Sequence, residues 1–181
     1  ILNKEAKLTV KFWGVRGSIP CPGMAYQRYG GNTPCVEITC GDKTLIFDAG
    51  TGLRALGQEL IKKGKIEAEI FFSHAHLDHI VGFPFFAPAF NPKNKFKIWS
   101  AVFDQQIPIK EVFQKLTSPP MFPVSLEVFN ANLDFLTFKP GDKIELDGGI
   151  SLFTVALNHP QGAVGYRVNF GERSVCYITD T

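Results

Sequence analysis

Residues 74–79 read His-Ala-His-Leu-Asp-His and put three imidazoles and one carboxylate into six positions. They follow an apolar run at residues 70–72, which is typical of a buried strand. If the backbone stays extended beyond that strand, His74 and His76 project from the same face, because side chains alternate along a strand. A turn into a helix or loop would let the aspartate and the last histidine face a second position beside the first. The motif therefore predicts a strand end that opens into a cluster of polar side chains.

The side chains of this motif are of the types that bind divalent cations, and the rest of the chain supplies two more. His159 is the only histidine outside the motif, and Asp180 ends a strand-like segment. Imidazole suits zinc and its neighbours, and a mixed set of imidazoles and carboxylates leaves positions for water, as catalytic sites require. A structural zinc site more often uses Cys-x-x-Cys pairs, which the four cysteines do not form. We therefore expect a two-metal hydrolase with these candidate ligands: His74, His76, Asp78, His79, His159 and Asp180.

The pattern His-x-His-x-Asp-His after a hydrophobic strand resembles the signature of the metallo-β-lactamase superfamily. Residues 45–52 are similar to the strand and turn that precede this signature, and His159 and Asp180 resemble its later histidine and bridging aspartate. Three further segments look like the branch that contains ribonuclease Z, phosphonate-pathway cyclic phosphodiesterases and related hydrolases. They are residues 12–18, 29–33 and 159–167. The resemblance covers nearly the whole chain.

This resemblance implies an α/β fold, the four-layer αββα sandwich, formed by residues 1–181 as a single domain. It implies that a first metal is held by His74, His76 and His159. A second metal would be held by Asp78 and His79, and Asp180 would bridge the two. Asp78 and Asp48 would be the catalytic carboxylates, Asp78 as a metal ligand and Asp48 by orienting a ligand histidine.

The end of the chain departs from the family pattern. In the family a further strand, a helix and a last histidine follow the bridging aspartate, whereas this chain ends at Thr181. It also begins with Ile1 rather than methionine. We therefore expect the C-terminal part of the domain to be incomplete.

The implied reaction is hydrolysis by a hydroxide shared between two divalent ions, since paired cations lower the pKa of water toward neutrality. Zinc is the expected metal, with manganese or iron as alternatives. The branch points to a phosphodiester substrate, either a cyclic or small nucleotide-like molecule or an RNA end. A lactonase or thioesterase-type hydrolase and a non-catalytic binding member of the fold remain as alternatives. A redox di-iron protein is disfavoured, because the family's oxygen-reducing members carry glutamate at the position of His76.

Composition limits the setting of the protein. With 181 residues, 45% of them hydrophobic, the chain can bury one substantial core. No stretch of about 18 apolar residues occurs, so we expect no membrane span. Four cysteines without a disulfide framework are expected to be reduced and buried, which favours a cytoplasmic location. The net charge of +2 leaves a nucleic-acid partner open without indicating one, and a homodimer is also left open.

Hydrophobic periodicity predicts alternating strands and helices. Strands are expected at residues 8–13, 35–40, 44–48, 70–72, 95–101, 133–138, 150–157, 164–170 and 174–178. Apolar residues recur at helical spacing at Leu53, Leu56, Leu60 and Ile61, and Gly64 is placed to end that helix. A short helix is expected around Phe113. Strands at both ends with helices between them fit two packed sheets covered by helices.

Two loops are candidates for substrate or partner contacts. Residues 14–33 carry Arg16, Ser18, Asn32 and Thr33, which could hold a phosphate group, although Gly, Ser and Asn are also ordinary turn residues. Residues 118–123 are proline-rich, and this segment could form a lid, a dimer contact or a surface loop pinned by Phe122 in the core.

Overall fold

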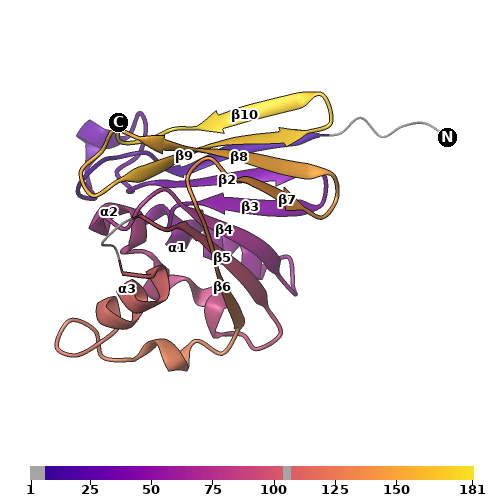
Figure 1. The fold of residues 1–181 in the computed structure, drawn as a ribbon. Coiled ribbons are helices and arrows are strands. Elements are labelled where there is room, and N and C mark those ends of the chain that lie inside the picture. The colour runs from indigo at the N-terminus through magenta and orange to yellow at the C-terminus, as the bar shows by residue number, and fades with distance from the viewer. Residues whose placement is uncertain (1–6, 104–106) are drawn as a thin grey trace.

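The computed structural model describes residues 7–103 and 107–181, and two β-sheets lie face to face in it (Figure 1). The larger sheet has the order β1-β2-β3-β4-β5-β6. Its strands are β1 (Leu8–Gly14), β2 (Cys35–Cys40), β3 (Lys43–Phe47), β4 (Glu67–Phe72), β5 (Lys95–Ala101) and β6 (Asn132–Phe138). β1, β2 and β3 pair antiparallel, whereas β3 to β6 pair parallel. The carboxyl ends of β3 to β6 therefore lie at one edge of the sheet.

The smaller sheet is antiparallel throughout, with the order β10-β9-β8-β7. Its strands are β7 (Lys143–Leu146), β8 (Ile150–Leu157), β9 (Ala163–Phe170) and β10 (Arg173–Tyr177). Aromatic side chains fill the space between the two sheets. The ring of Phe47 lies 5.3 Å from the rings of both Phe71 and Tyr166. Burial of this aromatic layer joins the sheets, because large aromatic side chains contribute most of the apolar area of a core.

The helices of the described residues are short. They are α1 (Gly52–Ile61), α2 (Leu77–Ile80) and α3 (Ile109–Leu116), together with the 3-10 turns η1 (Met24–Tyr26), η2 (Phe83–Phe85), η3 (Ala87–Phe90) and η4 (Leu126–Val128). Leu53, Leu56 and Leu60 lie on the buried side of α1, as their spacing predicted. Ile61, which was grouped with them, is instead exposed at the end of the helix. Gly64, at φ 87°, follows the end of this helix. α1 and α3 pack on the outer face of the larger sheet through a second apolar cluster.

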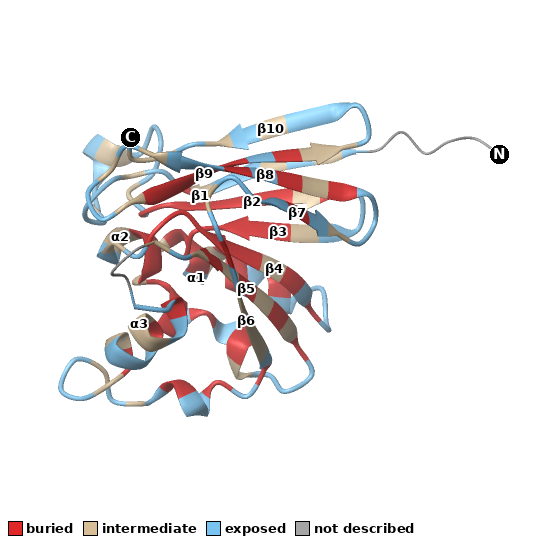
Figure 2. Cartoon of the chain, in the orientation of Figure 1, coloured by how far each residue is buried: buried red, intermediate tan, exposed pale blue. Residues whose placement is uncertain are grey.

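The outer face of the smaller sheet is open to solvent. Phe153, Val155 and Ile178 on this side are about half exposed, and the described helices lie on the side of the larger sheet (Figures 1 and 2). The described residues thus form one helical layer and both sheet layers. This confirms the predicted α/β class and its packed-sheet architecture.

Most element boundaries agree with the sequence to within one or two residues, and two differ in an informative way. β7 was not expected, because its four residues are too few to show a clear alternation. β4 ends at Phe72, so His74 and His76 lie in the loop that follows the strand rather than on its extension. The predicted single domain of residues 1–181 includes residues 1–6 and 104–106, which lie outside the described residues. Within the described ranges, no helix has the length and apolar character that a membrane span needs.

The proline-rich loop at residues 118–123 is held to the body of the protein by one aromatic contact. The ring of Phe122 lies 5.7 Å from that of Phe85 in an edge-to-face arrangement. Met121 beside it is largely exposed. Because Phe85 is exposed and Phe122 only partly buried, this contact lies at the surface and not in the core, where Phe122 was expected to pin the loop.

Candidate metal centre

The site lies where two neighbouring parallel strands end. Phe47 at the end of β3 is in register with Phe71 of β4, and Asp48 N–H donates to Phe71 O at 2.9 Å. The next residues of each chain segment, Asp48 and Ser73, are thereby side by side, and both are buried. In open α/β sheets, ligands bind beyond the carboxyl ends of such strands.

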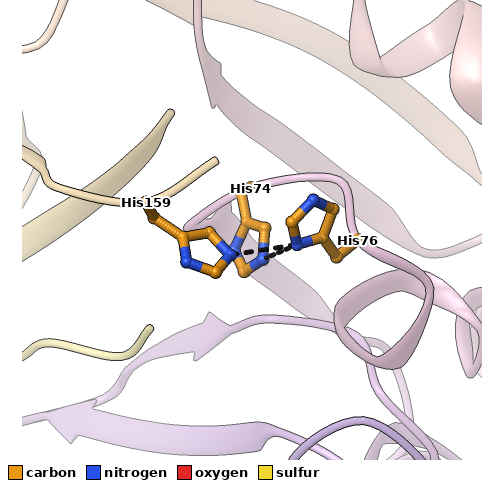
Figure 3. A group of neighbouring side chains, drawn as sticks. All are labelled: His74, His76 and His159. Carbon is orange, nitrogen blue, oxygen red and sulfur yellow. Dashed lines mark hydrogen bonds between the residues drawn. The ribbon is translucent and has the colours of Figure 1, made fainter. Parts of the chain in front are cut away.

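Three imidazoles converge just beyond this edge (Figure 3). His74 Nε2 lies 2.9 Å from His76 Nδ1, and His159 Nε2 lies 3.0 Å from the same nitrogen. We call these three residues the histidine triad. Each of them offers one nitrogen to a common point. The structure thus brings together the three residues that were predicted to hold the first metal.

The smaller sheet delivers His159 to this point. His159 follows β8, and the two sheets are joined beside it by two hydrogen bonds. Val164 N–H donates to Ser73 O at 2.9 Å, and the hydroxyl of Tyr166 donates to Phe72 O at 2.6 Å. These bonds fix the start of β9 against the loop that carries His74.

A second cluster adjoins the triad. His79 Nε2 lies 2.7 Å from Asp180 Oδ2 and 3.5 Å from Asp78 Oδ2. Asp180 Oδ2 also lies 3.5 Å from His74 Nε2, which belongs to the triad. Asp180 therefore stands between the two clusters, in the position that the bridging aspartate was predicted to take. The short helix α2 turns Asp78 and His79 toward this cluster, as the motif required.

The second cluster contains a polar atom that the protein leaves unsatisfied. His79 is fully buried, and among the described residues its Nε2 has no hydrogen-bond partner, despite the close carboxylate of Asp180. A buried polar atom without a partner normally costs about 1–3 kcal/mol. A cation held between His79 and the two carboxylates would satisfy this nitrogen and neutralise both oxygens. The donor set therefore fits a divalent metal ion.

Asp48 organises both clusters from behind. Its carboxylate accepts hydrogen bonds from the backbone N–H and the hydroxyl of Ser73, from His79 Nδ1 and from the hydroxyl of Tyr177, each at 2.7 Å. It is fully buried and has φ 59°, a left-handed conformation that is uncommon for residues other than glycine. Its contact with His79 agrees with the predicted orienting role, and Asp48 does not reach the triad directly.

The pKa values of the two buried histidines shift in opposite directions. Burial, together with the neighbouring charge of His79, lowers the pKa of His74 to about 4, so this imidazole is neutral at pH 7. Burial also acts to lower the pKa of His79, but the hydrogen bond to Asp48 and the charges of Asp48, Asp78 and Asp180 outweigh it and raise this pKa. The second cluster therefore attracts positive charge, whether a proton or a metal ion.

The loop at residues 14–33 touches the site through its backbone. Ser18 N–H donates to Asp78 Oδ2 at 2.8 Å, with Ser18 at φ 67°. Asn32 and Thr33 instead bond to Thr51, with Thr51 Oγ1 donating to Asn32 Oδ1 and Thr51 N–H donating to Thr33 Oγ1. Asn32 and Thr33 thus act as ordinary turn residues, which was one of the two interpretations of this loop. The contact between Ser18 and Asp78 was not predicted.

Two other contacts of the site could not be found from the sequence. Gln161 Oε1 lies 2.8 Å from His76 Nε2, and Tyr177 reaches Asp48 as described above. Each residue is far from its partner in the chain. The one available signal was position, because Gln161 follows His159 by two residues and Tyr177 precedes Asp180 by three.

Comparison with known proteins agrees with this geometry. The family model described as the beta-lactamase superfamily domain matches residues 43–181, whereas no curated protein sequence matches the chain. Among solved structures, the metallo-beta-lactamase fold protein YhfI from Bacillus subtilis is similar with a TM-score of 0.66 and 20% identity, over 96% of this chain and 63% of that one.

Two further solved structures resemble the chain. The short form of human tRNase Z, ELAC1, has a TM-score of 0.64 and 16% identity, over 94% of this chain and 68% of that one. A diphosphatase from the PhnP family has a TM-score of 0.63 and 18% identity, over 93% of this chain and 64% of that one. The chain spans roughly two thirds of the length of these structures, and at such identities the likeness shows the fold alone. With the family match and the histidine motif, it establishes that this chain belongs to the metallo-β-lactamase superfamily.

Proposed function

We propose that this chain carries the metal centre of a hydrolase that binds two divalent cations and cleaves phosphodiester bonds. Zinc is the metal that we expect at both positions. The substrate would be a cyclic or small nucleotide-like molecule or an RNA end. His74, His76 and His159 would hold one cation, Asp78 and His79 the other, and Asp180 would contact both. Cations bound there would lower the pKa of water and stabilise the charge that develops on the attacked group.

One observation carries the metal part of this proposal. Nε2 of His74 and Nε2 of His159 both lie within 3.0 Å of His76 Nδ1. The carboxylate of Asp180 lies between His74 of this triad and the unsatisfied Nε2 of His79. Neutral imidazoles gain little from such crowding unless a shared cation takes up their lone pairs. Nitrogen and carboxylate donors in this mixture suit zinc, and manganese or iron are the alternatives.

The chain's own residues prepare these donors. The hydroxyl of Ser73 donates to Asp48, so it accepts from His74 Nδ1 at 3.0 Å, and this leaves His74 Nε2 with a lone pair that faces the triad. His79 Nδ1 donates to Asp48 in the same way, which leaves its Nε2 to face Asp180. Hydrogen bonds of this kind fix the tautomer and the orientation of metal-binding histidines.

A pocket beside the triad offers room for a substrate. It has a volume of about 290 Å³, and His74, His76, Ile107, Val112 and Gln161 are among its lining residues. A lining that combines apolar side chains with imidazoles suits a small molecule with a polar reacting group. The choice of a phosphodiester is supported by the resemblance of residues 12–18, 29–33 and 159–167 to the ribonuclease Z branch, and by structural likeness to a tRNase Z and a diphosphatase.

The experiment that tests this function compares three substrates on the purified protein with added zinc or manganese: bis-p-nitrophenyl phosphate, a lactone and a thioester. We expect metal-dependent turnover of the phosphodiester, and its loss in His76→Ala with the circular dichroism spectrum unchanged, because the two sheets supply most of the burial. Turnover of only the lactone or the thioester would contradict the phosphodiester assignment. Full activity of His76→Ala would contradict the proposed metal site.

A further inference from the structure

We propose that Gln161 is a positioning residue for the metal centre, which holds His76 in the tautomer and orientation that present Nδ1 to the triad. This inference rests on the proposed metal-binding function of His76. It adds a residue that the motif at residues 74–79 does not contain.

The geometry of His76 determines which of its nitrogens carries a proton. Gln161 Oε1 can only accept a hydrogen bond, and it lies 2.8 Å from His76 Nε2, so that nitrogen donates. The other ring nitrogen, Nδ1, faces His74 Nε2 at 2.9 Å and His159 Nε2 at 3.0 Å. In the neutral imidazole the proton on Nε2 leaves a lone pair on Nδ1. The amide of Gln161 therefore favours the form of His76 that a cation at the triad would need.

A comparison of His76 with His74 shows why such a partner matters. His74 is buried and has Ser73 behind it. His76 is half-buried and lies in the loop between β4 and α2, without a strand to hold its ring. The contact with Gln161 ties this ring to the opposite sheet, 85 residues further along the chain.

The backbone of Gln161 is unusual in a way that agrees with this role. Residues 159–162 form a turn in which Gly162 N–H donates to His159 O at 2.9 Å, and Gln161 occupies its third position with φ 61°. Glycine or asparagine is favoured at a turn position with positive φ, because a longer side chain is strained there. Strained backbone conformations occur most often at functional sites, and here the strained residue lies beside a cluster of candidate metal ligands.

The same turn contains one member of the triad and contacts another. Its first residue is His159, and its third residue contacts His76. The turn therefore sets the distance between His159 and His76 as well as the orientation of the latter ring. Loss of the Gln161 side chain should loosen His76 without moving His159, since the backbone bond of the turn stays in place.

The test uses three variants of the purified protein, with zinc affinity measured by chelator competition at fixed pH. Gln161→Leu keeps the bulk and removes the acceptor, Gln161→Gly also relieves the positive φ, and Gln161→Glu keeps an acceptor oxygen. We expect the Leu and Gly variants to bind zinc at the triad roughly 10-fold or more weakly than the wild type. The Glu variant should bind within about threefold of the wild type, because its carboxylate still accepts from Nε2–H.

A second measurement needs no metal. Nitrogen-15 NMR of the metal-free protein can assign the tautomer of His76, since the chain holds only four histidines. We expect a protonated Nε2 in the wild type and a larger share of protonated Nδ1 in Gln161→Leu. Equal zinc affinity of the wild type, Leu and Gly variants would overturn the role of Gln161 while the metal site stands. A wild type that binds no zinc would overturn both proposals.

Discussion

The hydroxyl of Tyr177 donates a 2.7 Å hydrogen bond to Asp48 Oδ2, and so connects the last strand of the smaller sheet to the carboxylate behind the metal centre. The same oxygen of Asp48 also accepts from His79 Nδ1. Burial, together with the negative charge of Asp48, raises the pKa of Tyr177 well above its usual value. Tyr177 therefore remains a hydrogen-bond donor throughout the neutral pH range.

Replacing this tyrosine should lower the free energy of unfolding. Tyr177→Phe removes a donor to a charged group, which is worth roughly 1.5–3 kcal/mol, whereas Tyr166→Phe removes a donor to the neutral carbonyl of Phe72, worth roughly 0.5–1.5 kcal/mol. Urea denaturation of the two variants makes the comparison. An equal or smaller loss for Tyr177→Phe would show that the contact with Asp48 adds no stability.

A close backbone approach under the metal loop gives a second prediction. A Cβ atom on Gly82 would lie 2.0 Å from the carbonyl oxygen of Gly50, so Gly82→Ala forces the segment that follows α2 away from the turn between β3 and α1. We expect a loss of roughly 1–3 kcal/mol in the free energy of unfolding, as overpacking usually costs. Gly17→Ala is the matched control, since no described atom lies within 4 Å of the position that its added methyl group would take. Equal stability of both variants in thermal denaturation would contradict this packing.

Some features of the fold and of the metal centre can be predicted from the sequence, and others cannot. The motif at residues 74–79 identified four candidate metal ligands, and apolar runs predicted β3 and β4. Both signals are local in the sequence. The contacts of Tyr177 with Asp48 and of Gln161 with His76 span 129 and 85 residues. They depend on how the two sheets meet, which no local pattern encodes.

The short edge strand β7 was missed for a related reason. Its residues Lys143–Leu146 gain their strand conformation from pairing with β8, with Ile144 opposite Leu152. Four residues carry too little periodicity to reveal this in advance. The backbone contact of Ser18 with Asp78 is equally hidden, because an N–H group leaves no mark on the sequence.

The cysteines provide a test of the fold that does not involve the site. All four are free thiols, as their spacing predicted, but only Cys35 and Cys40 are buried, whereas burial was expected of all four. Burial raises the pKa of Cys40 to about 11 and raises that of Cys35 as well, so both stay protonated at pH 8, whereas Cys176 is exposed. Because the thiolate is the reactive form, iodoacetamide should label Cys176 well before Cys35 and Cys40, as mass spectrometry would show. Similar labelling rates for all three would contradict the described core.

Asp180 should matter more to one metal than to the other. Asp180→Asn removes a carboxylate that lies 2.7 Å from His79 Nε2 and 3.5 Å from His74 Nε2. Because the triad still offers three nitrogens, isothermal titration with zinc should show one strong site and one much weaker site. Asp134→Asn is the control, since this half-buried aspartate lies on β6 beside Lys95 and is not among the candidate metal ligands. Two undiminished sites in Asp180→Asn would remove this residue from the metal centre.

The number of metal ions per chain tests the proposed centre most directly. Purified protein, dialysed to equilibrium against zinc and then against metal-free buffer, is analysed for zinc and for protein concentration. Two clusters of donors joined by Asp180 predict two zinc ions per chain, falling to one or fewer in His76→Ala. Less than one ion per chain in the wild type would contradict the proposal that these residues form a metal centre.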